Sequence, residues 1–468
     1  MVDTQNKDVS VRSRFPVKAI IVFIVSMLLL TLGFYRNQWN AAGKKWFYDW
    51  KKNNDLMIVA RLVWSRQGDV FSEGALFGIG DGQWPLVAGL KDHQYEVYLN
   101  DGQFKTYTTY NSVIGIQGLI FGLIDKATNF QPGVNLKLFS GITSMLSAVV
   151  LALIVVWFFV EFGLLSALSV LGFCLISEWL TLYGGSIYWQ LWAFYIPMLG
   201  VGFYLFKTGA ENNIRHRHLA AMAVSTVVIK CLFNGFEFIT TALAMMSVPV
   251  VYYAISQKWK AKTFLAVGLN LFANAIVGIF ISLSVLLFQI ASVSGGLTQA
   301  LDYIVFTFGK RSLGDPGLYS GFEAESLRAD VWSVLWKYLY EGRAVILSNF
   351  IHTHIPWFQN QLEVEYYKLI VLFALFGLLF FVLSKWSRSS HLDNKTRALF
   401  YTTWFSVIPP LSWFVLFKAH SYIHLQLNYI IWQMPFTLFG FAFCGLVIRY
   451  FAERSKAMFF GQAKSKHE

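Results

Sequence analysis

The chain has 468 residues, of which 56% are hydrophobic, 18% aromatic and only 14% charged, and its mean hydropathy is +0.50. So apolar a chain cannot cover itself with a water-soluble surface, which excludes a soluble globular protein and indicates a polytopic membrane protein. The net charge of +12 does not indicate nucleic-acid binding, because the Lys and Arg residues form short clusters between apolar segments and not one basic domain.

Apolar segments long enough to cross a bilayer recur along the chain, since a span needs about 20 mostly apolar helical residues. We expect ten spans, near 17–34, 135–158, 163–180, 188–206, 217–234, 237–256, 263–290, 367–384, 398–417 and 425–448. No small-residue cleavage site follows the first segment, so we interpret it as an uncleaved helix. The basic clusters between spans fall on one side, which the positive-inside rule assigns to the cytoplasm.

This topology divides the chain into a small number of parts. They are a cytoplasmic tail (1–16), an N-terminal transmembrane module (17–290) with a first exoplasmic loop (35–134), a second exoplasmic loop (291–366), C-terminal transmembrane helices (367–448) and a second cytoplasmic tail (449–468). The apolar stretch 110–130 is short and Gly-rich, which predicts a juxtamembrane or re-entrant helix and not a span. The fold class is therefore an all-α polytopic membrane protein of about ten transmembrane helices with exoplasmic juxtamembrane helices.

Asp55 is the first candidate for chemistry. The apolar residues that follow it, Ile58, Val59, Leu62 and Val63, have helical spacing and predict a short amphipathic helix on the membrane surface. Such a helix would hold the Asp55 carboxylate at the bilayer boundary, where a lipid headgroup and an aqueous substrate can meet. The alternative is a solvated loop carboxylate or a helix cap.

The layout around Asp55 resembles the GT-C superfamily of polyprenol-dependent glycosyltransferases, across roughly residues 17–256. The resemblance lies in an early exoplasmic acidic residue in the pattern Asp55, Ala60, Gly68, an apolar juxtamembrane segment, and a rapid succession of spans. It implies a GT-C-like fold, Asp55 as catalytic base or orienting carboxylate, and Asp49 as the nearby rival. The family's His-Pro-Pro-Leu-type motif is replaced here by "TYTTYNSVIG", so the subfamily and the acceptor contacts stay open.

The resemblance also implies a reaction and a place for it. It implies transfer of a sugar from a polyprenyl-phosphate-linked donor to an exoplasmic glycan, lipid or protein acceptor. We expect the enzyme in a bacterial cytoplasmic membrane, with its active site on the exoplasmic face and in contact with membrane lipid. No cofactor is firmly implied, and a divalent metal ion is an open alternative without support in the sequence. The three cysteines, Cys174, Cys231 and Cys444, lack metal-ligand spacing and predict neither a zinc site nor a disulfide framework.

Four further candidates lie near the ends of expected spans. Glu178 and Tyr188 fall at an exoplasmic turn, where the carboxylate would line the site and the aromatic ring would stack on a sugar, or where aromatic residues only anchor the helix in the interface. Lys230 and Glu237 are seven residues apart around the next exoplasmic turn. They predict either a Lys–Glu ion pair that ties two helices together or a lysine that binds a lipid phosphate.

The last exoplasmic turn contains Lys418, His420 and His424, which a helix would place on one face with Asn428. This group is typical of a phosphate-binding cluster for the polyprenyl headgroup, with snorkelling or helix capping as the alternative. A zinc site lacks a third and a fourth ligand.

Basic residues in the second exoplasmic loop depart from the positive-inside trend. Arg311 is the candidate among Lys310, Arg311, Arg328, Lys337 and Arg343, which would hold an anionic carrier or an acidic acceptor beside an amphipathic helix at 327–347. Salt bridges to the acidic residues of the same loop are the alternative.

Two other functions compete with transfer from a polyprenyl phosphate. A polysaccharide polymerase or ligase acting on diphosphate-linked glycans would use the large loop 291–366. A secondary transporter would place charges near the bilayer midplane on broken helices and show inverted repeats. The expected spans are poor in charge at mid-membrane depth, which favours the enzyme.

Overall fold

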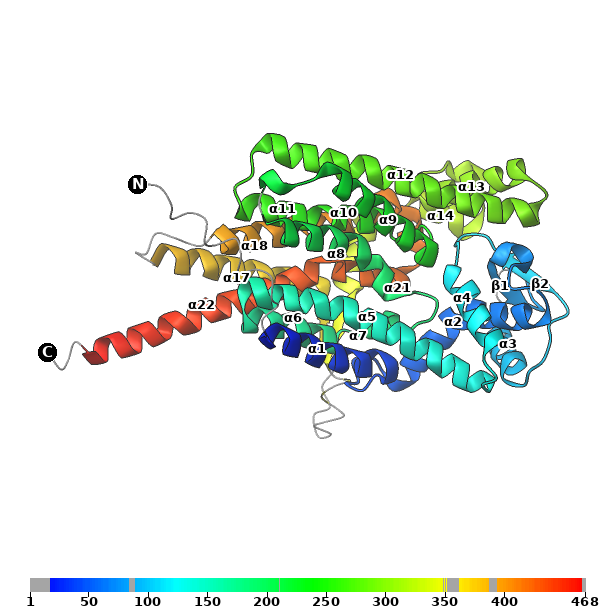
Figure 1. Ribbon diagram of the computed structural model, residues 1–468, viewed down its shortest axis with the longest axis horizontal. Helices are drawn as coiled ribbons and strands as arrows, with labels where there is room; N and C mark the ends of the chain where they lie inside the picture. Colours follow the sequence, from blue (N-terminus) through cyan, green and yellow to red (C-terminus); the bar gives the residue numbers. More distant parts are fainter. Residues whose placement is uncertain are drawn as a thin grey trace.

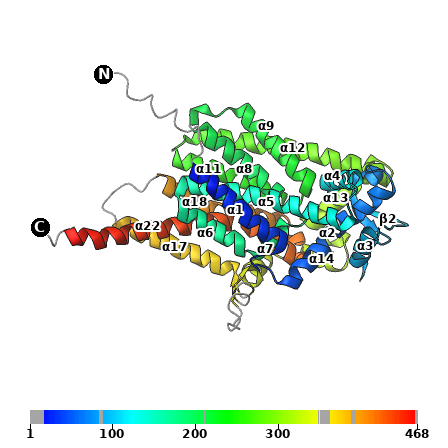
Figure 2. The same cartoon turned by 60° about the horizontal axis from the view of Figure 1, so that its bottom comes forward.

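The computed structural model describes residues 17–83, 89–209, 211–347, 349, 351, 362–386 and 394–464. It is 79% helical. Figure 1 shows an elongated bundle in which the ends of α11, α17 and α22 point to the left and the loop-rich segments gather at the right. We call the right-hand end, formed by residues 37–83, 89–131 and 295–328, the loop end, and Figure 2 shows the same end from another side, again at the right.

The first unit of the fold combines one span with the first long loop. Its helices are α1 (Val17–Arg36), α2 (Lys44–Gln67), α3 (Leu90–Leu99) and α4 (Ile116–Ala127). Between them, β1 (Phe77–Gly80) pairs antiparallel with β2 (Tyr107–Tyr110), with Phe77 opposite Tyr110. The 12 residues of α4 make a helix of about 18 Å, too short to cross a bilayer core of about 30 Å.

The bundle itself is built from the remaining long helices and several short ones. They are α5 (Pro132–Phe162), α6 (Leu164–Ile176), α7 (Glu178–Gly184), α8 (Leu191–Thr208), α9 (His216–Asn234), α10 (Ile239–Met245), α11 (Ser247–Ser256), α12 (Ala261–Ser294), α17 (Tyr366–Trp386), α18 (Asn394–Phe405), α19 (Ile408–Leu416), α20 (Lys418–Ile423), α21 (Leu425–Asn428) and α22 (Phe436–Lys464). Short 3-10 helices connect some of them, at Ser72–Ala75, Glu211–Asn213, Pro316–Leu318 and Tyr429–Gln433.

Eight helical segments of the described chain are long and apolar enough to cross a membrane, and a ninth if α6 and α7 together count as one span. The protein is therefore an all-α membrane protein. Each segment coincides with one of the ten expected spans. The expected span at 217–234 corresponds to α9, which is helical but is not among the eight because its composition is more polar.

The span expected at 163–180 is not one straight helix. The chain bends by 71° between α6 and α7. Ser177 stands at the bend, where its Oγ accepts a hydrogen bond from the N–H of Leu180 and so caps a new helix. The hydrophobic pattern alone did not reveal this cap.

The second long loop is less helical than the sequence suggested. It contains α13 (Leu297–Arg311), α14 (Gly321–Arg328), α15 (Val331–Trp336), a π-helix (Lys337–Glu341) and the antiparallel pair β3 (Arg343–Ile346) and β4 (Glu363–Glu365). The single helix expected at 327–347 is wrong. Asp330 interrupts it by capping α15, and at Gly342 a Cβ would lie 2.3 Å from the carbonyl oxygen of Tyr338, so the chain turns there into β3.

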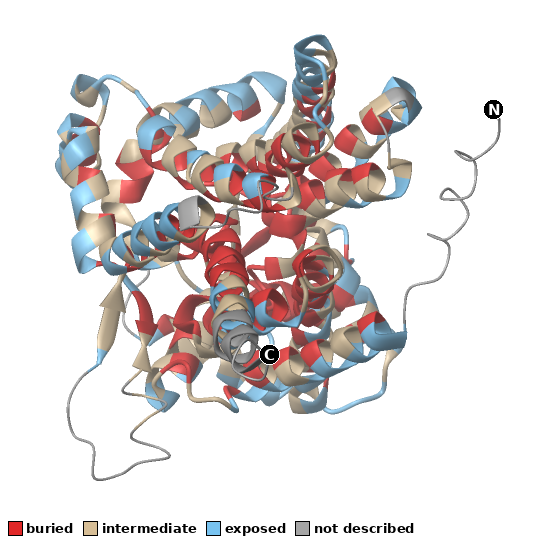
Figure 3. Cartoon of the chain, turned by 90° about the vertical axis from the view of Figure 1, so that its left-hand side faces the viewer, coloured by how far each residue is buried: buried red, intermediate tan, exposed pale blue. Residues whose placement is uncertain are grey.

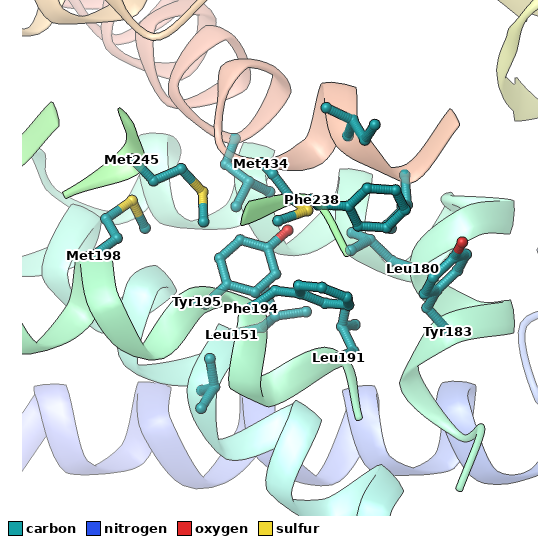
Figure 4. Packing of buried hydrophobic residues seen from close by; sticks show 14 of the residues in the cluster. Leu151, Leu180, Tyr183, Leu191, Phe194, Tyr195, Met198, Phe238, Met245 and Met434 are labelled. Atoms are coloured by element: carbon teal, nitrogen blue, oxygen red, sulfur yellow. The ribbon is translucent and has the colours of Figure 1, made fainter. Parts of the chain in front are cut away.

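Buried residues concentrate along the axis of the bundle, and exposed ones cover its outer helix faces (Figure 3). Figure 4 shows one part of this core, where Phe194, Tyr195 and Met198 of α8 pack among residues of neighbouring segments, including Phe238 and Met434. The short segments that connect the helices, among them residues 185–190 and 235–238, are held on this core. They carry the polar groups described next.

Candidate functional site

Asp55 lies in the middle of α2 and is buried, not displayed on a membrane surface. Its Oδ1 accepts a hydrogen bond from Ser186 Oγ at 2.6 Å and another from the backbone N–H of Tyr188 at 3.1 Å. Lys51, one turn earlier on α2, donates its Nζ to Ser140 Oγ at 2.6 Å. The carboxylate is thus fixed by the segment between α7 and α8.

The surroundings of Asp55 tune its protonation. Burial raises the pKa of Asp55 to about 6, although the nearby Lys51 ammonium and the hydrogen bonds from Ser186 and Tyr188 act in the opposite direction. Burial also lowers the pKa of Lys51, against the attraction of Asp55. A carboxyl group with a pKa near 6 is ionised at neutral pH and still basic enough to accept a proton.

A second group of polar side chains surrounds Glu237, in the turn between α9 and α10. Arg311 Nη1, at the end of α13, lies 2.8 Å from Glu237 Oε1, and both side chains are largely buried. His420 Nε2, on α20, lies 3.6 Å from Glu237 Oε2, and the rings of His420 and His424 are 4.7 Å apart. Four of the sequence candidates therefore meet in one cluster, although they come from three distant segments.

Burial and the neighbouring charges set the protonation states of the side chains in this cluster. Burial opposes ionisation of Glu237, but Arg311, the two histidines and Lys230 together outweigh it and hold the pKa of Glu237 below its ordinary value. Burial lowers the pKa of His420 to about 3, and it also lowers that of His424. At neutral pH the cluster thus contains an ionised Glu–Arg pair beside two neutral imidazoles.

Tyr188 and Tyr110 connect Asp55 to the Glu237 cluster. The backbone N–H of Tyr188 binds Asp55, while its hydroxyl forms a side-chain hydrogen bond with Tyr110. Arg311 Nη2 in turn lies 3.4 Å from the Tyr110 hydroxyl. These contacts connect Asp55 to Arg311 through the backbone and then the side chain of Tyr188, and we call the four residues the Asp55–Arg311 network.

Two buried acceptors in the cluster have no hydrogen-bond partner among the described atoms. They are Glu237 Oε2 and His420 Nδ1, both in side chains that are more than nine-tenths buried. Buried polar atoms in native proteins are mostly paired. These acceptors, together with the guanidinium of Arg311, are therefore able to bind the hydroxyl and anionic groups of a polar substrate.

Two of the sequence candidates have structural roles instead. Lys230 Nζ donates to the carbonyl oxygens of Gly235, at 2.8 Å, and Glu237, at 2.5 Å, and so holds the turn that carries Glu237. The side-chain ion pair expected between Lys230 and Glu237 is not formed. Lys418 Nζ donates to the carbonyl oxygens of Leu327 and Ala329 and caps the end of α14. The capping interpretation of Lys418 thus matches its contacts.

Glu178 stands apart from the Asp55–Arg311 network. It is buried at the start of α7 and lines a cavity of about 590 Å³ with Trp46, Trp179 and Tyr429. Arg343 and Glu363, which form a salt bridge at 2.8 Å, line the same cavity. Tyr188, the aromatic residue expected beside Glu178, is not among the residues that line this cavity.

The histidines are not on one continuous helix. The chain breaks at His424, between α20 and α21, so the regular spacing expected from His420 to Asn428 is wrong, although the two imidazoles still approach each other. In the part of the chain that the structure describes, no group of three or more His, Cys, Asp or Glu side chains is placed to hold a metal ion. The three cysteines are free and buried.

Sequence reasoning missed Ser186, Tyr110 and Lys51. Ser186 follows two glycines, and at Gly185 a Cβ would lie 2.3 Å from the carbonyl oxygen of Phe34. A close backbone approach of this kind requires glycine, so the pair "GG" before Ser186 was the available signal. Tyr110 belongs to the stretch "TYTTYNSVIG", but nothing in that pattern indicates that its hydroxyl meets Arg311.

An apolar groove lies within the bundle, away from these polar groups. It measures about 500 Å³ and is formed mainly by α5 and α8, with lining residues that include Leu153, Trp157, Trp192, Ile196 and Phe203. A groove with this lining suits a hydrocarbon chain.

Comparison with protein-family models, with curated proteins and with solved structures gives no match for this chain. The class that the fold defines is an all-α integral membrane protein.

Proposed function

We propose that the protein is an integral-membrane glycosyltransferase that moves a sugar from a polyprenyl-phosphate-linked donor to an acceptor on the exoplasmic side of a bacterial cytoplasmic membrane. The observation that carries this proposal is the Asp55–Arg311 network, which joins a buried carboxylate of raised pKa to a guanidinium through two tyrosines. The layout of the first half of the chain, which resembles the GT-C superfamily, supports it.

Asp55 is the base in this proposal. In an inverting transfer, a base removes the proton of the acceptor hydroxyl as that oxygen bonds to the anomeric carbon and the bond to the phosphate oxygen breaks. Ser186 and Tyr188 both donate to Asp55 Oδ1. In this proposal the proton of the acceptor goes to Oδ2. A pKa of about 6 brings Asp55 near the operating pH, where a general base works best.

Arg311 is the group that binds the phosphate. Its guanidinium presents several N–H donors in a plane, a geometry that suits phosphate oxygens. Glu237 fixes one edge of it and Tyr110 another. The negative charge that develops on the leaving phosphate would be stabilised there.

Binding of undecaprenyl phosphate tests this assignment, with undecaprenol as the uncharged control ligand. We expect the protein in nanodiscs to prefer the phosphate and Arg311→Gln to weaken that binding by about 10- to 100-fold, because a hydrogen bond to a charged group contributes about 1.5–3 kcal/mol. Arg343→Gln, which alters an exposed arginine paired with Glu363, is the matched control. Equal binding of undecaprenyl phosphate and undecaprenol would refute the proposal that the donor is a polyprenyl phosphate.

A secondary transporter is a second candidate, and one observation favours it. The span formed by α6 and α7 is broken at Ser177, and the buried Glu178 at the break faces a cavity, as in transporters whose broken helices carry the substrate site. Labelling of a Glu178→Cys variant from each side of sealed vesicles separates the two. A transporter exposes this position alternately to both sides, whereas the proposed enzyme exposes it to one side only.

A further inference from the structure

The helix α13 runs back along α12 from the loop end. Gly295 and Gly296 connect the two helices with φ angles of +90° and +147°, a conformation that glycine adopts readily. Ala300, Tyr303 and Ile304 of α13 then pack in one cluster with Leu286, Leu287 and Ile290 of α12. Figure 1 shows α13 beside the right-hand end of α12. Because the two helices form an antiparallel hairpin, each further turn of α13 lies closer to the middle of the bundle.

The neighbouring helix α12 carries a lipid-facing stripe. It is one of the membrane-crossing helices and is among the least buried of them. Its exposed large apolar residues extend along it, at Leu265, Leu269, Phe272, Phe280 and Phe288. The 34 residues of α12 span about 51 Å and exceed a bilayer core of about 30 Å. The stripe indicates that its apolar zone reaches at least to Phe288.

Exposed side chains on α13 change character along the helix. Exposed polar residues, Thr298, Gln299 and Asp302, occur only in its first half among the described side chains. In the second half, Val305 is 63% exposed and Phe308 is 61% exposed. Residues equally far from the Gly295–Gly296 turn lie at about the same level of the hairpin, so Ile304 lies near the level of Leu287 in the same cluster. Phe308 lies one turn, about 6 Å, further along. These apolar side chains therefore lie at a depth where α12 itself faces lipid.

The two cations that end α13 are both paired with carboxylates. Lys310 Nζ donates to Glu323 at 3.1 Å, and Arg311 Nη1 donates to Glu237 at 2.8 Å. Cations held at membrane depth are expected to pair in this way, because an unpaired charge in a medium of low dielectric constant is costly. Two exposed tryptophans, Trp332 and Trp336, follow one turn apart on α15, as residues of an interfacial aromatic belt would be.

We propose that α13 is a re-entrant helix whose second half is inserted among the acyl chains of the leaflet at the loop end, with Val305 and Phe308 in contact with lipid. The occupant of its exposed face is the membrane, because that face continues the lipid-facing stripe of α12. Insertion carries Arg311, three residues beyond Phe308, below the level of the lipid headgroups, where its ion pair with Glu237 offsets the cost of placing the charge there. The insertion of α13 itself does not depend on the proposed transfer reaction.

Site-directed spin labelling of the whole protein in liposomes tests the insertion. Nitroxides are attached to single cysteines at Leu301, Val305 and Phe308, all of which are exposed, and the three buried native cysteines are replaced by alanine. Collision with oxygen, which concentrates in lipid, is compared with collision with a water-soluble nickel complex. Phe280 on α12 is the lipid reference and Phe71, exposed at the loop end, is the water reference.

We expect the oxygen-to-nickel ratio to rise from Leu301 to Val305 to Phe308 and to be several-fold higher at Phe308 than at Phe71. Nickel accessibility at Phe308 equal to that at Phe71 would overturn the insertion. Equal depth at all three positions would overturn re-entry as well, since the helix would then lie flat on the surface. Failure of undecaprenyl phosphate to bind would leave the depth profile unchanged, so the two proposals fail separately.

Discussion

Removal of the Glu237 carboxylate tests how much the buried ion pair between Glu237 and Arg311 contributes to the free energy of unfolding. Glu237→Gln keeps the size of the side chain but leaves Arg311 without its partner, where Arg311 is 18% exposed and Glu237 only 5% exposed. Breaking a buried pair from one side costs about 3–5 kcal/mol, because the remaining charge stays buried. Arginine cannot lose its proton in a protein, so Arg311 has no way to reduce this cost.

The reverse substitution has a different pH dependence. In Arg311→Met, Glu237 can bind a proton, and this protonation costs about 1.4 kcal/mol for each unit by which the pH exceeds its pKa. In the wild type, the pKa of Glu237 is held below its ordinary value, so the pair stabilises the fold above that range and this contribution is lost as the pH falls. We therefore expect Arg311→Met to lose stability at pH 7 and recover part of it at pH 5, whereas Glu237→Gln recovers none.

The assay is the free energy of unfolding in detergent, from titration with sodium dodecyl sulfate followed by circular dichroism. The double variant Glu237→Gln/Arg311→Met closes a mutant cycle that isolates the pair. Arg343→Met is the control, because Arg343 is 51% exposed in its pair with Glu363 and such pairs contribute about 0–1 kcal/mol. The reasoning is refuted if Glu237→Gln costs no more than this control.

Three further substitutions give distinct outcomes. Asp55→Asn should abolish transfer and raise the free energy of unfolding at pH 7 by about 2–3 kcal/mol, measured in the same titration. The pKa of Asp55 is about 6 in the folded protein and lower in the unfolded chain, so the ionised carboxylate destabilises the fold above pH 6. This destabilisation fades as the pH falls toward 4. If transfer has its base in Asp55, its rate against pH should fall below about pH 6. Lys418→Ala should cost about 1–2 kcal/mol of stability by uncapping α14 and leave the Kd for undecaprenyl phosphate unchanged; a weakened Kd would return Lys418 to the binding site. Gly185→Ala should displace Ser186 from Asp55, seen as a stability loss larger than that of Gly172→Ala, where a Cβ meets nothing within 4 Å.

The membrane architecture could be predicted from the sequence because it depends on long apolar runs. A run of about 20 apolar residues has few alternatives to a spanning helix. The break between α6 and α7 could not be predicted in the same way, because Ser177 is one residue in an apolar context and its capping bond becomes visible only in three dimensions. The failure of the helix at 327–347 has a similar cause, a cap at Asp330 and a close backbone approach at Gly342.

The candidate site, like the fold, could be predicted from the sequence only in part. Rare ionisable residues near span ends, such as Glu237, Arg311 and His420, could be selected from sequence because charge is costly there. Which of them touch could not be deduced, since the pairing of Glu237 with Arg311 instead of Lys230 depends on the path of α13. The burial of Asp55 was also missed, because the residues that bury it lie more than 130 positions away, at Ser186 and Tyr188.

This separation along the chain also has a consequence in time. Ser186 is 131 residues after Asp55, and Arg311 is 74 residues after Glu237. At a synthesis rate of about 5–20 residues per second, Asp55 waits roughly 7–26 s for Ser186, and Glu237 waits roughly 4–15 s for Arg311. During these intervals each carboxylate of the growing chain must remain hydrated at the membrane surface. A chain that is truncated between residues 237 and 311 lacks Arg311, so Glu237 has lost the partner that neutralises it.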